Sequence, residues 1–181
     1  FDYIKSGYTY WDRSFDLRLN IKKQTDFFPN ITVGLQDIIG TGLFASEYLV
    51  ASKNIFNAFN LTTGLGWGRL ATNNVIGSTG KRPYQSHALG GRLRYKDMFQ
   101  GDVGLFGGIE YKPIDNNLKL NIEYSSDSYT NDSDYNLQMP TSQINFGIDY
   151  KLSDSINLSS YYAQGKELGL QLKDTGLFFP V

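Results

Sequence analysis

The sequence contains no cysteine and only one histidine among its 181 residues. The lack of thiols excludes a disulfide framework and thiolate metal sites, although it says little about the compartment, because many envelope proteins lack cysteine. No run of about 18 apolar residues is present, which excludes a transmembrane helix. No cationic start precedes an apolar stretch, so we expect an exported chain to be a mature form or an excised piece.

An excess of charge of one sign is also missing. The formal net charge is −1 at pH 7, so no field favours nucleic acid as a partner. A length of 181 residues predicts one domain, spanning residues 1–181, rather than two. The chain is instead rich in tyrosine (13 residues), phenylalanine (12) and glycine (19), which is a composition of pleated sheets rather than of helices.

Residues 59–70 (FNLTTGLGWGRL) show a clear period of two. Alternate residues from Phe59 to Trp67 are mostly large and apolar, whereas those between them are small and polar and end in three alternate glycines. A period of two predicts a strand, because successive side chains leave a strand on opposite faces. The apolar side chains would face a core in a soluble sheet and lipid in a membrane barrel. This strand alone does not separate the two structures.

The same alternation recurs along the chain and predicts about nine strands. They lie in residues 15–21, 31–35, 42–53, 59–70, 101–113, 118–126, 144–152, 156–162 and 168–173. Segment 42–53 also fits helical spacing. As a strand, it should direct Phe44, Tyr48 and Val50 outward and Glu47 inward.

The lengths of the connections distinguish the two ends of the predicted sheet. Residues 71–100 and 127–141 read as long polar loops, and the other connections are short. In a meander the connections alternate between two ends, and both long loops fall at the same end. Short turns at one end and long loops at the other are typical of outer-membrane barrels. The sequence therefore predicts an antiparallel up-and-down transmembrane β-barrel of about eight or nine strands, alone or within a larger barrel, with both loops extracellular.

Charged side chains support the same orientation. Seven of them fall in positions that we expect to face the barrel interior, namely Asp16, Arg18, Glu47, Glu110, Lys119, Glu123 and Asp149. A basic residue facing lipid at mid-bilayer costs about 2 to 4 kcal/mol, whereas both signs in the interior allow ion pairs. These residues are candidates for packing or for contact with a polymer. A soluble sheet with a wet outer face obeys the same alternation rule and remains an alternative.

Aromatic and glycine residues add two further expectations. Four aromatic side chains are predicted to anchor the barrel at the membrane interfaces: Trp67, Tyr111, Tyr124 and Tyr150. Glycines recur at predicted interior positions, at residues 34, 64, 66, 68, 104 and 147. Glycine permits the bends that close a small barrel, which is the interpretation we favour, or it vacates volume for a plug or a sugar chain. Since side chains fill an eight-stranded barrel, a conducted polymer would require a larger assembly.

Several blocks of the sequence resemble the YjbH family of exopolysaccharide-associated outer-membrane proteins of Gram-negative bacteria. They span most of residues 12–129 in the same order: WDRSFDLRL, VGLQDIIGTGLFASEYLVASK, LTTGLGWGRLA, FQGDVGLFGGIEYKP and LKLNIEYSSDSY. Beyond them the chain matches in pattern and includes AQGKELGLQLK.

The resemblance implies an outer-membrane β-barrel that is encoded with capsule or exopolysaccharide machinery. Family members resemble proteins with two barrel regions in a much longer chain, and this sequence would correspond to one region. The implied role is non-enzymatic, without a cofactor, in production or export of the polymer. The implied partners are outer-membrane lipids, exopolysaccharide and other polysaccharide-export proteins.

Support for catalysis, metal binding or adhesion is weaker in the sequence. An outer-membrane hydrolase would need Ser86 and His87 to converge with a carboxylate, but adjacent residues on an extended segment point apart. Asp127, Asp132 and Asp134 have calcium-binding oxygens but lack the glycine and distal glutamate of a calcium loop, so we expect a solvated acidic loop and no metal. A structural or adhesive surface protein, acting through its loops, is a third class.

The first long loop is basic. Its cationic residues are Lys81, Arg82, Arg92, Arg94 and Lys96. Charge-assisted hydrogen bonds would let such a loop contact lipopolysaccharide phosphates or an acidic polymer. Pairing with the acidic loop beside it explains the same charges equally well.

Overall fold

The computed structural model describes residues 3–5, 8–10, 14–39, 44–83, 95–113, 117–129 and 140–174. These residues form strands and a single turn of 3-10 helix, η1 (Arg69–Ala71). No described helical segment is long and apolar enough to cross a membrane. The strands are β1 (Tyr3–Lys5), β2 (Tyr8–Tyr10), β3 (Leu17–Lys22), β4 (Asn30–Gln36), β5 (Ser46–Ile55), β6 (Phe59–Gly68), β7 (Val75–Ser78), β8 (Asp102–Tyr111), β9 (Leu118–Tyr124), β10 (Ile144–Lys151), β11 (Ile156–Ala163) and β12 (Glu167–Asp174).

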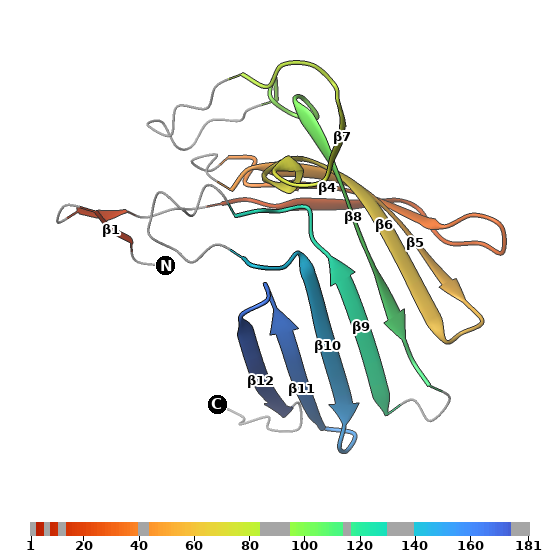
Figure 1. Cartoon of the computed structure of the whole chain (residues 1–181). Coiled ribbons are helices and arrows are strands. Elements are labelled where there is room, and N and C mark those ends of the chain that lie inside the picture. Colours follow the sequence, from red (N-terminus) through yellow and green to blue (C-terminus); the bar gives the residue numbers. More distant parts are fainter. Residues whose placement is uncertain are drawn as a thin grey trace, which may run out of the picture.

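Most of the strands lie side by side in one antiparallel sheet (Figure 1). The order is β3-β4-β5-β6-β8-β9-β10-β11-β12, with β7 added beside β8, and β1 and β2 form a separate pair. This order confirms the predicted all-β, up-and-down meander. The edges of the sheet are β3 and β12, and the described strands do not close into a barrel.

Connections of different length separate at the two ends of the sheet, as predicted. At one end, here the turn end, lie residues 23–29, 56–58, 112–117 and 152–155. At the other, the loop end, lie residues 37–45, 69–101, 125–143 and 164–166. The predicted loop 71–100 is not wholly irregular, because β7 pairs with β8 within it. Tight turns are achieved with left-handed residues, as in Phe56 (φ 53°) and Asn57 (φ 55°) between β5 and β6.

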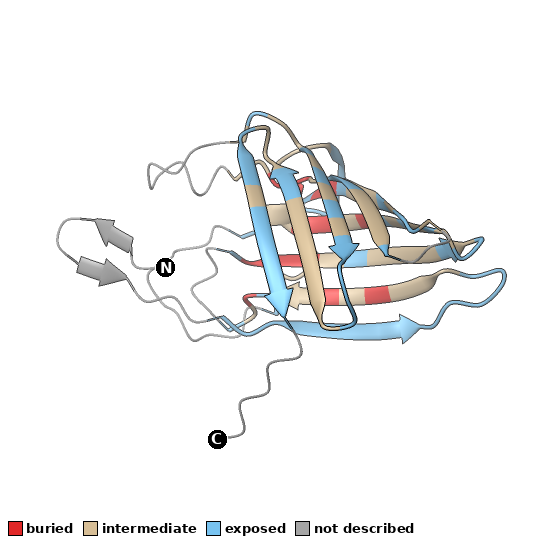
Figure 2. Cartoon of the chain, turned by 90° about the horizontal axis from the view of Figure 1, so that it is seen from below, coloured by how far each residue is buried: buried red, intermediate tan, exposed pale blue. Residues whose placement is uncertain are grey.

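The register aligns apolar side chains on one face of the sheet, which we call the outer face. One row runs through Leu61, Ile109, Ile122, Phe146 and Tyr162 on successive strands. The alternate residues define the inner face, which is polar and glycine-rich. In β10 the apolar residues are exposed, whereas Asn145, Gly147 and Asp149 between them are half-buried. The polar face is therefore the sheltered side of this curved sheet (Figures 1 and 2).

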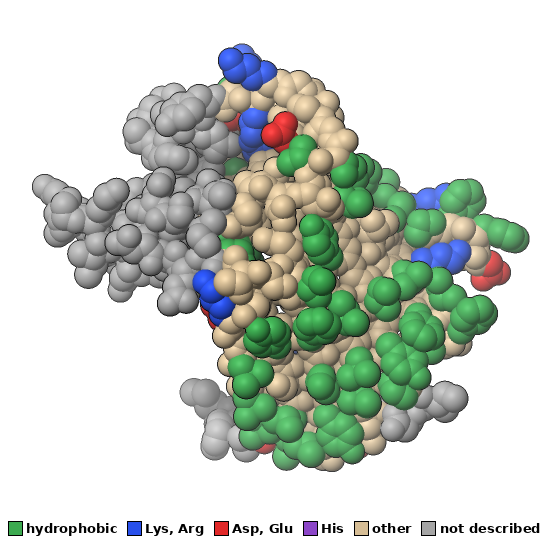
Figure 3. Space-filling model, in the orientation of Figure 1, with side chains coloured by type: hydrophobic (Ala, Val, Ile, Leu, Met, Phe, Trp, Pro, Cys, Tyr) green, Lys and Arg blue, Asp and Glu red, His purple; other side chains and the backbone are tan. Residues whose placement is uncertain are grey.

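The described residues lack the apolar core of an ordinary sheet protein. Four hydrophobic residues are buried in them, whereas 30 large hydrophobic side chains are exposed. The buried polar residues include Thr32, Ser46, Asp127 and Ser126. In Figure 3 hydrophobic side chains cover much of the visible face of the sheet, and charged side chains gather toward its margins. The polarity of the sheet is inverted relative to a protein that folds around an apolar interior.

Strand β5 differs from its predicted orientation. Its register pairs Glu47 with Leu35 and Trp67, so Glu47 lies on the outer face rather than inward. Tyr48 and Val50 accordingly face inward, not outward as predicted. The prediction was wrong because alternation defines two faces but not which one is outer. Pairing with β4 and β6 decides that.

Aromatic rings cover glycines of neighbouring strands on the inner face. A Cβ added at Gly34 would lie 1.9 Å from Cζ of Tyr48, and one at Gly64 would lie 2.3 Å from Cζ of Phe106. Tyr48 and Phe106 are the direct cross-strand partners of these glycines. The glycines thus provide room for rings that lie flat on the sheet. Neighbouring side chains, rather than a vacant channel, occupy the space that these two glycines leave.

Gly104 provides a test of this close packing. A Cβ there would lie 2.3 Å from the carbonyl oxygen of Leu70 and 3.0 Å from Cα of Ala71, so backbone must move. We expect Gly104→Ala to lower the free energy of unfolding by about 1 to 3 kcal/mol, measured by urea denaturation in detergent micelles. Gly77→Ala is the control, because an added Cβ meets no described atom within 4 Å. Equal stability of the two variants would contradict the packing.

Candidate functional site

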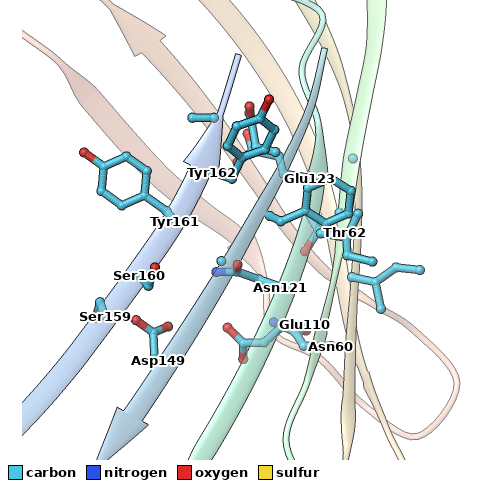
Figure 4. A pocket seen from close by; sticks show the side chains of 18 of the residues that line it. Asn60, Thr62, Glu110, Asn121, Glu123, Asp149, Ser159, Ser160, Tyr161 and Tyr162 are labelled. Carbon is cyan, nitrogen blue, oxygen red and sulfur yellow. Dashed lines mark hydrogen bonds between the residues drawn. The ribbon is translucent and has the colours of Figure 1, made fainter. Parts of the chain in front are cut away.

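A cavity of about 580 Å³ lies along the inner face of strands β6 to β12. Figure 4 shows the polar side chains that line it, which come from six neighbouring strands. The polar lining residues are Asn60, Thr62, Glu110, Asn121, Glu123, Asn145, Asp149, Ser159, Ser160, Tyr161, Tyr162 and Gln171. Such a volume is within the range of small-molecule sites. We call this cavity the inner groove.

An ion-pair network holds one side of the inner groove. The ammonium group of Lys119 lies 2.8 Å from Oδ2 of Asp149 and 3.6 Å from Oε2 of Glu110. The hydroxyl of Ser159 donates to Oδ1 of Asp149 at 2.5 Å. Lys112 adds a second cation 3.0 Å from Oε1 of Glu110. These bonds fix the direction of both carboxylates before any ligand is present.

Other polar groups of the inner groove are available for a ligand. Among the described residues, the side chains of Asn60, Asn121 and Glu123 have no hydrogen-bond partner. Asn60 lies directly opposite Glu110, and Glu110 lies opposite Asn121 on the next strand. Asn60, Glu110 and Asn121 therefore form one row across β6, β8 and β9, and Glu123 lies two residues beyond Asn121 on β9. Strands about 4.8 Å apart place successive polar groups within reach of one extended ligand.

A second cluster ties the connections of the loop end together. Nε of Arg69 donates to Oδ2 of Asp127, and the guanidinium carbon lies 4.9 Å from the ring of Phe44 and 4.8 Å from that of Tyr129. The Tyr129 amide donates to Oδ1 of Asp127 at 2.7 Å. The side chains of Arg69 and Asp127 are only 17% and 9% exposed. We call residues 69–74 and 125–129 the loop-end cap.

Further hydrogen bonds complete the loop-end cap. The hydroxyl of Ser126 donates to the carbonyl oxygen of Leu70 at 2.6 Å, and the amide of Ser128 donates to Oγ1 of Thr72 at 2.8 Å. Burial raises the pKa of the Tyr129 phenol above its ordinary value, although a hydrogen bond with Gln164 opposes this. The phenol thus stays neutral beside Asp127 at physiological pH.

The described parts of the connection 69–101, residues 69–83 and 95–101, also fold back over the outer face at the loop end. Arg82 donates to both oxygens of Glu47, at 2.7 and 3.0 Å, and the amide of Phe99 donates to Oε2 at 3.1 Å. Trp67 is 8% exposed, packs edge-on against Phe99 and donates to Oγ1 of Thr79 at 2.9 Å. Trp67 therefore does not have the exposure expected of an interface anchor, because this connection covers it.

The structure separates the seven predicted interior charges. Five of them share the inner face by register: Arg18, Glu110, Lys119, Glu123 and Asp149. Asp16 precedes β3 and accepts a hydrogen bond from the amide of Asp37 at 2.9 Å. Glu47 lies on the outer face with Arg82. Lys53 also lies on the outer face, near the turn end, and donates to the carbonyl oxygen of Asp26 at 2.6 Å.

The remaining predicted aromatics are exposed on the outer face. Tyr111 stacks on Phe59 with a centroid distance of 4.8 Å at the turn end. Tyr150 also lies toward the turn end and is 43% exposed, whereas Tyr124, 36% exposed, lies at the loop end. Their anchoring role stays a prediction.

Several other predicted residues lie outside the described residues. They are Ser86 and His87 of the hydrolase alternative, Arg92 and Arg94 of the basic loop, and Asp132 and Asp134 of the acidic loop. Among the described cations of the basic loop, Arg82 pairs with Glu47 of β5 and not with the acidic loop. Asp127 of the acidic loop pairs with Arg69.

Interpretation of the sequence alone did not identify Tyr161, Asn121 or Asn60 as candidate site residues. Their alternation placed them on the inner face, which is the one signal available for them. Charged residues are recognisable as interior candidates in the sequence, whereas uncharged polar side chains on a strand do not stand out from ordinary barrel lining. Strand pairing is what collects these three in one groove.

Fold and site together define a class of protein. It is an all-β protein built on an antiparallel meander, with an exposed apolar outer face, a polar inner groove and a hydrogen-bonded cap over one end.

Comparison with known proteins is consistent with this class. The family described as "Exopolysaccharide biosynthesis protein YbjH" matches residues 3–176. The "Uncharacterized lipoprotein YjbH" of Escherichia coli (strain K12) is 37% identical over 164 residues, which cover 87% of this chain and 23% of that relative. The chain belongs to the YjbH family, whose description names exopolysaccharide biosynthesis, and it spans less than a quarter of the length of this relative. No solved structure matches it.

The loop-end cap predicts a large effect at Asp127. Asp127→Ala removes the carboxylate that accepts hydrogen bonds from the guanidinium of Arg69 and from the amide of Tyr129, so we expect the free energy of unfolding to fall by about 3 kcal/mol. Urea denaturation measures this, and limited proteolysis should show faster cleavage within 69–101. Asp154→Ala is the matched control, because it breaks the exposed pair with Lys151 and should change stability little. A cap that tolerates Asp127→Ala equally well would not depend on this ion pair.

Proposed function

We propose that this sheet forms the wall of a β-barrel in the outer membrane of a Gram-negative cell, with its outer face against lipid. In this role the protein supports exopolysaccharide production or export without catalysing a reaction. The observation that carries the proposal is the exposed apolar outer face, which continues from strand to strand across the sheet. A patch of this extent requires an apolar cover, and acyl chains provide one.

The dimensions of the outer face are close to those of an outer-membrane barrel. From Phe59 to Leu65, short of the covered Trp67, the strand advances six residues, or roughly 20 Å at about 3.3 Å per residue. The apolar band of an outer-membrane barrel is about 25 Å tall and is flanked by aromatic residues. Phe59, Tyr111 and Tyr150 provide such residues at the turn end, and Tyr124 and Tyr162 at the loop end. The long connections of the loop end would then lie outside the cell.

The direction of the edge strands bears on closure. Because nine strands alternate along the meander, β3 and β12 run in the same direction. Antiparallel closure therefore needs an odd number of further strands between them. We propose that the sheet is one wall of a barrel that such strands complete.

The role in the cell follows from the family. The description of the family names exopolysaccharide biosynthesis, and the Escherichia coli relative is called a lipoprotein, which fits association with a membrane. Outer-membrane lipids and lipopolysaccharide, exopolysaccharide and other polysaccharide-export proteins are the proposed partners. Nucleic acid is not, because the net charge is −1.

Arginine substitutions on adjacent residues test the orientation in lipid. Ile122 is 51% exposed on the outer face, and Asn121 lies beside it on the inner face. We expect Ile122→Arg to destabilise the protein in bilayers by about 2 to 4 kcal/mol, and Asn121→Arg to be tolerated beside Glu110 and Glu123. Folding into phospholipid vesicles, followed by heat-modifiable gel migration, measures both. Tolerance of arginine at Ile122 would indicate that this face contacts water.

Secretion tests the cellular role. In a bacterium that carries the full-length gene, deletion should abolish or strongly reduce exopolysaccharide at the cell surface, and the wild-type gene should restore it. His87→Ala should restore secretion fully, because the proposed role requires no general base. Secretion that is lost with His87→Ala, while the protein level stays normal, would favour an enzyme instead.

A further inference from the structure

Tyr161 presents a flat aromatic surface at the inner groove. It extends from β11 away from β10 (Figure 4), and a Cβ added at its β12 partner Gly169 would lie 2.1 Å from Cζ of the ring. The ring therefore lies across the backbone of Gly169. Because Tyr161 is 48% exposed, its other side remains accessible. Tyr161 and Phe106 both cover glycines of the inner face, and both line the inner groove.

Tyr161 continues the row of uncharged and acidic side chains described above. The register runs Asn60, Glu110, Asn121, Gly147 and Tyr161 on five successive strands. Gly147 adds no side chain between the amide of Asn121 and the ring. The row thus combines planar hydrogen-bonding groups at one end with an aromatic surface at the other.

This combination matches the chemistry of a sugar chain. Amide and carboxylate groups bind pairs of adjacent hydroxyls, because each offers two donors or acceptors in one plane. The electron-rich face of an aromatic ring attracts the C–H bonds that cover one side of a pyranose. An apolar ligand would leave Asn60, Asn121 and Glu123 unpaired, which disfavours it.

Charge restricts the sugar further. The charged side chains that line the inner groove are all acidic, namely Glu110, Glu123 and Asp149, and Lys112 and Lys119 offset two of them from beside it. Carboxylates or phosphates on a ligand would be repelled by this surface. Uncharged sugars experience no such repulsion.

We propose that the inner groove binds a segment of an uncharged glycan, with Tyr161 stacking on one sugar ring and Asn60, Asn121 and Glu123 binding hydroxyls. The inference rests on the proposed role in exopolysaccharide and identifies the class of ligand and the residues that contact it. The bound segment crosses β6 to β11 rather than entering a pore. Glu110, Lys119 and Asp149 keep the floor of the site ordered.

Titration calorimetry on the full-length protein in detergent micelles tests the site. The probes are three neutral hexasaccharides, cellohexaose, laminarihexaose and maltohexaose, and the charged probe is oligogalacturonate. We expect at least one neutral probe to bind and oligogalacturonate to bind about ten-fold more weakly or not at all. Preference for oligogalacturonate, or binding of no neutral probe, overturns the proposal.

Variants of two tyrosines on opposite faces locate the binding surface. Tyr161→Ala should weaken the neutral probe about ten-fold, whereas Tyr161→Phe should bind within about two-fold, since the ring alone stacks. Tyr150→Ala is the control, because Tyr150 is similarly exposed (43%) but lies on the outer face and does not line the inner groove. Equal losses at both tyrosines, or none at Tyr161, overturn the assignment.

Heat-modifiable migration of each tyrosine variant keeps the two proposals separate. It should match the wild type in Tyr161→Ala, so that weaker binding reports the site and not the fold. If arginine at Ile122 is rejected by bilayers but no neutral glycan binds, the groove assignment fails and the membrane orientation stands. If glycans bind and arginine at Ile122 is tolerated, the groove assignment stands and the membrane orientation fails.

Discussion

Burial of polar groups and exposure of apolar ones is the constraint on which the rest of this structure depends. Between the edge strands β3 and β12, each strand pairs with a neighbour on both sides, so alternation is free to place large apolar side chains on the outer face without breaking the ladder. On the inner face Lys119 pairs with Asp149 and Glu110, whereas Asn60, Asn121 and Glu123 have no hydrogen-bond partner among the described residues. Orientation in lipid and the inner groove both follow from this one division.

Glycines and rings allow the sheet to curve around its polar side. Gly34, Gly64 and Gly169 each receive an aromatic ring from the adjacent strand, which packs the inner face without adding thickness. The same arrangement produces exposed aromatic surface where the ring lies over the groove, as with Tyr161. A structural solution to curvature thereby creates a surface suited to a sugar.

The loop end shows how long connections gain order without an apolar core. Arg69 and Asp127 are 58 residues apart and hold two connections together through one buried ion pair. Arg82 does the same for Glu47 across 35 residues. The Arg69–Asp127 pair belongs to the loop-end cap, and the Arg82–Glu47 pair lies on the outer face at the same end of the sheet. The pair with Glu47 also neutralises Arg82 of the predicted basic loop, so less positive charge of that loop is available for lipopolysaccharide.

Alternation in the sequence determined the strands, their up-and-down order and the separation of long from short connections, because side chains at a period of two and turn residues are local properties. It also placed Glu110, Lys119 and Asp149 together on one face. Only tertiary structure decided that Glu47 faces outward and that Trp67 is covered. The face of Glu47 depends on pairing with β4 and β6, and the cover over Trp67 comes from Thr79 and Phe99, which lie further along the chain. The row from Asn60 to Tyr161 likewise exists only through register, since five strands must align before their side chains form one groove.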